Sequence, residues 1–146
     1  MAAQEHLFVY GTLLAQSGHE MARLLDRHAT KVGEGRIQAR LYIIHEIDDQ
    51  GPNSYPAAVP SPHNRDVVHG MLYRLDTPDD VLPVFDEFEA CTPGWPEPYE
   101  FLRRPIDVTL ADGTVTRAAC YLYTWDTSRA TPVPSGRITE AMPDAR

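Results

Sequence analysis

The residues best suited to chemistry begin with a short segment near the start of the chain, Leu7-Phe8-Val9-Tyr10-Gly11-Thr12-Leu13-Leu14. Its apolar, strand-forming part stops at the Tyr10-Gly11-Thr12 step, where the backbone must turn. Glycine adopts backbone conformations closed to other residues and lets a ligand approach the main chain closely. The amides of Gly11, Thr12 and Leu13 are therefore candidate donors to an anionic or carbonyl oxygen. An ordinary turn at the end of a strand gives the same pattern.

The second candidate is a carboxylate at the end of the segment Leu82-Pro83-Val84-Phe85-Asp86-Glu87-Phe88-Glu89. The apolar side of a helix here is formed by Val81, Leu82, Phe85 and Phe88. At about 100° per residue, Glu89 projects between Leu82 and Phe85, whereas Glu87 points to the solvent side. Burial raises the pKa of a carboxyl group, which suits a general base that later returns its proton. The simpler alternatives are that Glu89 turns out to solvent or pairs with an arginine at 103 or 104.

The size and composition of the chain limit the classes of protein that it can be. Its 146 residues, 42% of them hydrophobic, fit one folded domain with its own core. A net charge of -8 disfavours nonspecific binding to nucleic acid or to an anionic membrane. The two cysteines, Cys91 and Cys120, indicate neither a disulfide framework nor a zinc site. Without a signal peptide or a membrane-spanning stretch, the protein is expected to be cytoplasmic.

The pattern of apolar and turn-forming residues predicts an α+β protein, mostly antiparallel, with its strands in a curved sheet or small barrel. The expected strands are 6–9, 36–44, 67–75, 99–110 and 114–124, the last two joined by a turn at Ala111-Asp112-Gly113. The expected helices run from Ser17 or Gly18 to about Arg27, and from Thr77, which caps it, to about Glu89. Residues 48–64 are expected to form a loop. Residues 1–125 are expected to form a single domain and residues 126–146 an irregular tail.

These segments, taken in order, resemble the γ-glutamylcyclotransferase-like family, which includes the AIG2-like and γ-glutamylamine cyclotransferase branches. The resemblance extends from about Leu7 to Trp125. The matching segments are Tyr10-Gly11-Thr12-Leu13, Ser54-Tyr55-Pro56-Ala57-Ala58-Val59, Val68-His69-Gly70-Met71-Leu72-Tyr73, Phe85-Asp86-Glu87-Phe88-Glu89, Tyr99 with Arg103-Arg104, and Ala119-Cys120-Tyr121-Leu122-Tyr123.

The resemblance implies a fold, a reaction and a site. The fold is a small mixed, mostly antiparallel β-barrel flanked by helices. The reaction cyclises a small-molecule γ-glutamyl amide to 5-oxoproline and releases the amine, with no metal or other cofactor. The segment Tyr10 to Leu13 binds the substrate through its backbone, and Glu89 accepts and returns the proton. Two departures from the family bear on substrate choice: Ala90 stands where glycine is common, and the insert 91–98 contains three prolines.

Three tyrosines are further candidates for the pocket. Tyr99 and Tyr123 are expected to line the substrate pocket or to hydrogen-bond the substrate, and Tyr55 is expected at its entrance. Tyr121 shares its strand face with Tyr123. Core aromatic residues would show the same pattern in all these cases.

Other kinds of chemistry find little support in the residue pattern. The six histidines show no metal-ligand spacing, and there is no Gly-x-Ser-x-Gly elbow, Walker loop or dinucleotide fingerprint. The alternatives that stay open are a non-catalytic module that binds a γ-glutamyl or 5-oxoproline-like molecule, and a cyclotransferase that removes a γ-glutamyl protecting group from a biosynthetic intermediate. Free γ-glutamyl amino acids, γ-glutamyl-ε-lysine, glutathione-like peptides and carrier-tethered amides all fit the expected reaction. The pattern predicts no oligomeric state.

Overall fold

The computed structural model of the chain describes residues 5–10, 20–49 and 51–138. Its helices and strands, in chain order, are β1 (His6–Val9), α2 (Glu20–His28), β2 (Ala29–Asp48), β3 (Gly51–Pro60), β4 (Val67–Leu75), α3 (Pro78–Phe88), β5 (Phe101–Leu110), β6 (Val115–Tyr123) and β7 (Thr131–Pro132).

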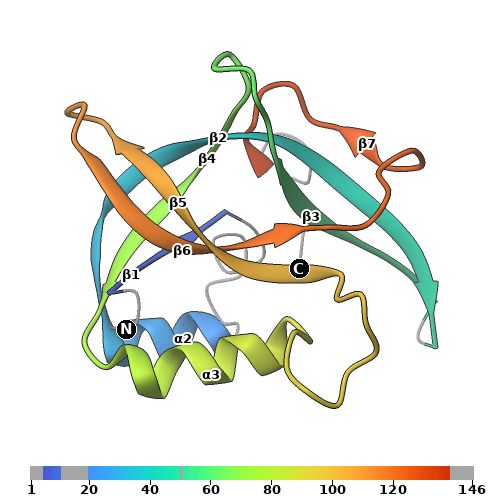
Figure 1. Ribbon diagram of the computed structural model, residues 1–146, viewed down its shortest axis with the longest axis horizontal. Coiled ribbons are helices and arrows are strands. Elements are labelled where there is room, and N and C mark those ends of the chain that lie inside the picture. The colour runs from blue at the N-terminus through green and yellow to red at the C-terminus, as the bar shows by residue number, and fades with distance from the viewer. Residues whose placement is uncertain (1–4, 11–19, 50, 139–146) are drawn as a thin grey trace.

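Five of the described strands close into a barrel (Figure 1). The sheet order is β3-β2-β4-β1-β6-β5. β2 also pairs with β5, and this pairing closes the strands β2, β4, β1, β6 and β5 into a ring. β1 and β6 run parallel, whereas the other paired strands are antiparallel. β3 and β7 extend the sheet from the outer part of β2. The predicted α+β class and small mixed, mostly antiparallel barrel are therefore confirmed.

Two glycines stand opposite each other where the barrel wall is most crowded. Gly35 of β2 pairs in register with Gly70 of β4. A Cβ atom on Gly35 would lie 2.7 Å from Cγ1 of Val108, and one on Gly70 would lie 2.4 Å from the carbonyl oxygen of Val9. Because neither residue has a side chain, β2 and β4 can approach β5 and β1 closely enough for the barrel to close.

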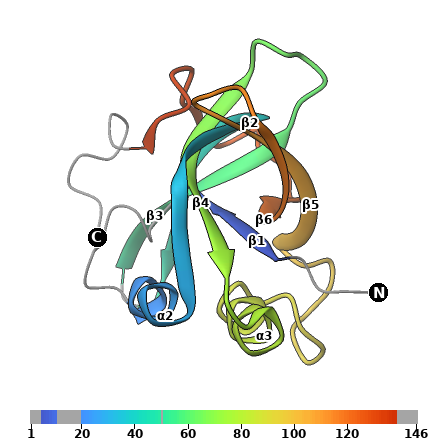
Figure 2. The same ribbon diagram turned by 90° about the vertical axis from the view of Figure 1, so that its left-hand side faces the viewer.

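The hydrophobic core has two parts, separated by the barrel wall. One fills the barrel interior and includes Phe8, Ile37, Val68, Leu72 and Cys120. The other lies between the barrel and the two helices and includes Leu7, Leu25, Leu82, Phe85 and Tyr121. Figure 2 shows α2 and α3 side by side across the same end of the barrel. α3 packs beside α2, and near its C-terminal end Asp86 contacts Tyr121 of β6 and Arg103 of β5.

The loop predicted at residues 48–64 is wrong over most of its length. Residues 51–60 form β3, which pairs with β2 over ten residue positions, from Asp48 opposite Gly51 to Ala39 opposite Pro60. The three prolines of β3 suggested a loop, but they stand at every fourth position. Their nitrogens therefore share one edge of a strand that ends the sheet order, where no ladder donor is required. β2 extends beyond both ends of the strand that was predicted at residues 36–44.

Most of the other predicted elements match the structure. β1 and β4 have the predicted bounds, and β5 and β6 form the predicted hairpin, in which Gly113 has a φ of 90°. Thr77 precedes α3, but its side chain makes no capping hydrogen bond, contrary to the prediction. Residues 126–138 lie mostly in turns and bends, and two of them, Val133 and Ile138, are buried in the core of the barrel. No helix among residues 20–28 and 78–88 is long and apolar enough to cross a membrane.

Candidate active site

Glu89 lies at the C-terminal end of α3, on the side that faces the barrel. Its amide donates to the carbonyl oxygen of Phe85 at 2.8 Å, which makes it the residue that caps the helix. The following residue, Ala90, has a φ of 60°, in the left-handed region that glycine adopts most easily, so a non-glycine residue is held here in a less favourable conformation. Desolvation, together with the negative charge of Glu100, raises the pKa of Glu89 to about 7.

The carboxylate of Glu89 has no hydrogen-bond or ion-pair partner within the described part of the chain. Arg103 pairs with Asp86, not with Glu89. Desolvation is the main cause of the raised pKa of Glu89, although the residue as a whole is only partly buried. The Glu89 carboxylate is therefore poorly solvated without being fully enclosed by the described residues.

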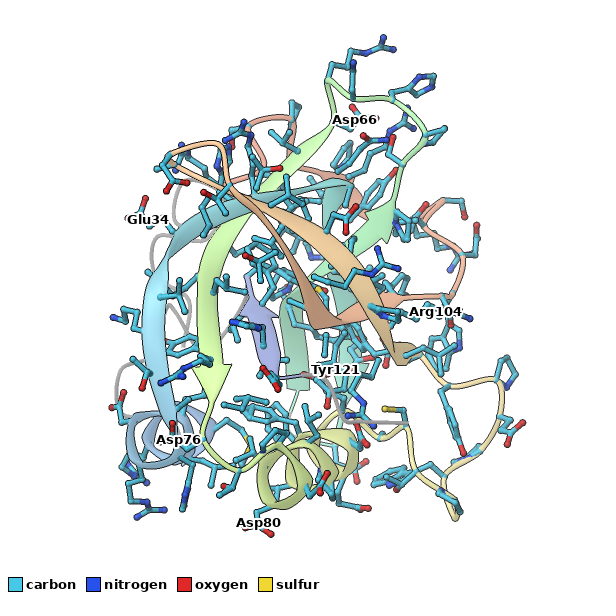
Figure 3. All side chains as sticks on the ribbon, turned by 60° about the vertical axis from the view of Figure 1, so that its left-hand side comes forward. Glu34, Asp66, Asp76, Asp80, Arg104 and Tyr121 are labelled. Carbon is cyan, nitrogen blue, oxygen red and sulfur yellow. The ribbon has the colours of Figure 1, made fainter. Side chains whose placement is uncertain are left out.

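A three-residue network holds the last turns of α3 against the barrel. The hydroxyl of Tyr121 on β6 donates to Oδ1 of Asp86 at 2.7 Å, and Nε of Arg103 on β5 lies 3.2 Å from the same oxygen. The ring of Tyr121 also packs against Phe85, with centroids 6.4 Å apart. Figure 3 shows Tyr121 at the junction of the barrel and α3. The contacts of Asp86 depend on strands far along the chain, so the helical pattern alone does not indicate them.

Tyr10 directly follows β1 and is buried in the barrel interior, where its hydroxyl both donates and accepts a hydrogen bond. The hydroxyl donates to the carbonyl oxygen of Tyr121 at 2.7 Å and accepts from the amide of Ala58 at 3.1 Å. Burial is the main cause that raises the pKa of Tyr10, and the charge of Glu89 also contributes. Tyr10 itself is therefore held by strands β3 and β6 and lies within electrostatic reach of Glu89. The predicted backbone donors at residues 11–13 lie outside the described residues.

Tyr55 lies between two carboxylates that sequence reasoning missed. Its hydroxyl donates to Oε2 of Glu100, with Oε1 of Glu46 at 3.2 Å. Desolvation and the charge of Glu46 raise the pKa of Glu100, whereas the hydrogen bond from Tyr55 opposes this shift. Glu100 directly precedes β5 and Glu46 lies on β2. No short motif connects these segments, and the one sequence signal was the placement of Tyr55 at the pocket entrance.

The two other candidate tyrosines have different surroundings. Tyr123 is buried on β6, and its ring meets that of Phe101 edge to face at 5.3 Å. Tyr99 is partly exposed next to the insert, and its carbonyl oxygen accepts from the hydroxyl of Thr124. Among the described contacts, none joins Tyr99 to Glu89. The structure thus places Tyr10 in the barrel interior and Tyr123 in the part of the core beside the helices, and leaves Tyr99 partly exposed next to the insert.

The insert after α3 is fixed by Glu87, which was expected to be simply solvated. The Glu87 carboxylate accepts from Oγ1 of Thr92 at 2.8 Å and from Nε1 of Trp95 at 3.0 Å. Phe88, which was expected on the buried side of the helix, is 48% exposed. At its end α3 therefore buries only one edge against the barrel, and the insert folds back along the other.

Comparison with known proteins identifies one matching family and several solved structures with a similar fold. The family described as "Gamma-glutamyl cyclotransferase, AIG2-like" matches residues 7–139. The structure of YkqA from Bacillus subtilis is similar with a TM-score of 0.64 and 19% identity, over 95% of this chain and 41% of that protein. An AIG2-like protein from Mus musculus gives 0.59 and 21%, over 93% and 95% of the two chains. A structure described as a gamma-glutamyl cyclotransferase gives 0.63 and 18%, over 96% and 79%.

The chain thus spans less than half of the length of the Bacillus protein. At these identities the similarity shows a shared fold. No sequence among curated proteins matches the chain significantly.

Proposed function

Because this chain belongs to the gamma-glutamyl cyclotransferase, AIG2-like family, we propose that it cyclises a γ-glutamyl amide to 5-oxoproline and releases the amine. The observation that supports this proposal best is the carboxylate of Glu89. It is poorly solvated, lacks a partner among the described residues, and has its pKa raised to about 7. A base with this pKa can accept a proton and return it near neutral pH.

In this reaction the substrate supplies its own nucleophile. The α-amine attacks the γ-carbonyl carbon, a C–N bond forms, and the five-membered ring closes. Glu89 takes one proton from the α-ammonium and passes it to the nitrogen of the scissile amide, whose C–N bond then breaks to release the amine. The attacking nitrogen loses its second proton to the released amine or to water as the lactam forms. No atom of the protein becomes covalently attached. Holding the amine and the carbonyl in reactive geometry lowers the activation barrier by roughly 7–11 kcal/mol.

The other site residues have supporting roles in this proposal. The amides of Gly11, Thr12 and Leu13 stabilise the oxygen that becomes negatively charged, or bind the α-carboxylate of the substrate. Tyr10, which directly precedes these residues in the chain, is itself held by its two hydrogen bonds. Tyr55 and Tyr123 form part of the pocket wall, and Tyr99 contributes at its margin. Asp86 keeps the end of α3 in place through Tyr121 and Arg103.

The experiment that tests this proposal measures 5-oxoproline release from a panel of γ-glutamyl amides. Wild type should release 5-oxoproline from at least one amide, and Glu89→Gln should lose at least about 100-fold in kcat, because a positioned general base contributes on that order. Glu34→Gln removes the same charge on β2, away from α3 (Figure 3), and should keep the wild-type rate. Release by Glu89→Gln at the wild-type rate, or no release by the folded wild type from any amide, would contradict the proposal. In the second case, unchanged amide binding by Glu89→Gln would favour the binding module.

A further inference from the structure

A second cavity, of about 380 Å³, lies where the middle of β2 and β4 meets the end of the described chain. Neither Glu89 nor any of the candidate tyrosines is among its described lining residues. Its volume lies within the range of sites that bind small molecules. The cavity is therefore a candidate binding site in its own right, separate from the candidate active site.

Three basic side chains line this cavity: Arg36 on β2, His69 on β4 and Arg137 near the end of the described chain. Arg36 and His69 are register partners in the antiparallel β2–β4 pair, so their side chains lie next to each other on one face of the sheet. Two side chains that can both carry a positive charge repel each other in this arrangement. A bound anion would replace that repulsion by attraction to both groups.

The two arginines of the cavity have no acidic partner among the described residues. The ion pairs in this part of the chain use Arg40, Arg103 and Arg117 instead. Glu34 also lines the cavity but forms no ion pair with either arginine. In a chain with 21 acidic and 13 basic residues, acidic partners are plentiful, so two unpaired guanidinium groups at one cavity are a distinctive feature. They leave hydrogen-bond donors available to a ligand.

The backbone that carries Arg137 is fixed on both sides. The carbonyl oxygen of Gly136 accepts from the amide of His69 at 2.9 Å, and Gly136 has a φ of 70°. A Cβ atom on Gly136 would clash with the carbonyl oxygen of Val67, so only glycine fits at this close approach to β4. Ile138, on the other side, is 5% exposed and packs in the barrel core. Arg137 is therefore held at the cavity although its segment forms neither helix nor strand.

The lining of the cavity matches a phosphate group that is attached to an apolar organic part. Guanidinium groups form paired hydrogen bonds to phosphate oxygens, and an imidazole can donate one more. A phosphate monoester carries close to two negative charges at neutral pH, which complements two unpaired arginines better than a single carboxylate does. Met71 and Ile138 add apolar surface to the same cavity, and a methionine thioether packs well against aromatic rings.

We propose that this cavity binds a small phosphate monoester with an aromatic or other apolar part, and that Arg36, His69 and Arg137 bind its phosphate group. Glu34 lies one register pair further along the ladder, opposite Met71, and takes no part in the phosphate contact. The site is independent of the proposed cyclisation reaction, because it shares none of the described residues assigned to that reaction.

Phenyl phosphate, inorganic phosphate and phenol test this inference on the full chain, with affinities measured by isothermal titration calorimetry. We expect phenyl phosphate to bind at least about ten-fold more tightly than inorganic phosphate, and phenol to show no measurable binding at the same concentrations. Added salt should weaken the binding of phenyl phosphate, because Arg36 and Arg137 are exposed. In amide NMR spectra, the signals of Gly35 and Gly70, which line the cavity, should shift.

Two variants and a matched control separate a specific site from a general charge effect. Arg36→Gln and Arg137→Gln should each weaken the binding of phenyl phosphate at least about ten-fold, because each removes a charged, two-pronged donor. Arg36→Lys should restore only part of the affinity, since lysine keeps the charge but not the paired geometry. Arg74→Gln removes the same charge from an exposed position on β4 that does not line the cavity, and should keep the wild-type affinity.

Several results would overturn the inference. One is the absence of phenyl phosphate binding by the folded wild type. Another is equal affinity for phenyl phosphate and inorganic phosphate, because the organic part would then make no contact. An equal loss of affinity in Arg36→Gln and Arg74→Gln would show that binding follows net charge alone. Shifted NMR signals at Tyr10 and Glu89, with unshifted signals at Gly35 and Gly70, would place the phosphate at the candidate active site instead. None of these measurements uses a γ-glutamyl amide, so the proposed function holds or fails independently.

Discussion

Replacing Glu89 by glutamine should stabilise the folded protein, and the gain should depend on pH. Desolvation, with the charge of Glu100, raises the pKa of Glu89 from 4.5 to about 7. Because a ten-fold change in proton affinity corresponds to about 1.4 kcal/mol, the ionised form costs about 3 kcal/mol more in the folded protein than in the unfolded chain. Glutamine keeps the shape of the side chain but does not ionise, so it avoids this cost.

The sign of the effect follows from which state holds the proton. Below the pKa of the unfolded chain, near 4.5, Glu89 is protonated in both states and contributes no penalty. As pH rises toward about 7, the unfolded chain loses this proton while the folded protein keeps it, so wild-type stability falls. Above that pH the penalty is constant. The stability advantage of Glu89→Gln over wild type should therefore grow by about 3 kcal/mol between acid and mildly alkaline pH.

Urea unfolding at a series of pH values, followed by circular dichroism, measures this difference. All other titrating groups are common to the two proteins, so their contributions largely cancel. Glu34→Gln, which removes an exposed carboxylate from β2, should differ from wild type by no more than about 0.5 kcal/mol at any pH. A difference between Glu89→Gln and wild type that does not change with pH would refute the burial of an ionisable Glu89, and with it the case for a tuned base.

Three further predictions test the surroundings of Glu89. Glu100→Gln should move the acid limb of the pH–rate profile to lower pH, because the charge of Glu100 helps to raise the pKa of Glu89. An acid limb that does not move would show that Glu100 does not influence the pKa of Glu89. Tyr10→Phe should lower the free energy of unfolding by about 1–3 kcal/mol, since a buried amide and a buried carbonyl each lose their partner; urea unfolding measures it, and a neutral result would argue against these hydrogen bonds. Gly70→Ala should lower the melting temperature by several degrees, because its Cβ would lie 2.4 Å from the carbonyl oxygen of Val9; an unchanged melting temperature would show that the barrel wall can relax there.

The parts of the fold that the sequence predicts well have a local cause. The strand at Val67–Leu75 and the helix at Pro78–Phe88 have the predicted types, since each carries a strong pattern of apolar residues. β3 was missed because prolines usually break strands. Their tolerance at residues 51–60 depends on the strand lying at one end of the sheet, which is a property of the assembled fold.

The same distinction applies to the site. The position of Glu89 on the barrel side of its helix could be predicted, because helical periodicity requires only residues close in sequence. The proximity of Glu100 and Glu46 could not be predicted, because it depends on how the strands pair. Tyr55 on β3 contacts Glu46 diagonally across the β2–β3 pair, and it contacts Glu100 at the start of β5. The surroundings of Glu89 are therefore harder to predict from sequence than its position on the helix.

The burial that tunes Glu89 also works against folding, so other contacts must hold it in place. The Tyr121 hydroxyl, the Asp86 carboxylate and the Arg103 guanidinium form a charge-assisted network that fixes the end of α3 a single helical turn before Glu89. None of these groups needs to touch a substrate to matter for the reaction. Glu89 keeps its raised pKa only while the helix end stays against the barrel, because a helix that lifts away would return the carboxylate to water. Asp86→Asn should therefore lower kcat and shift the acid limb of the pH–rate profile toward that of a solvated carboxylate, whereas a loss of kcat without that shift would assign Asp86 to a different role.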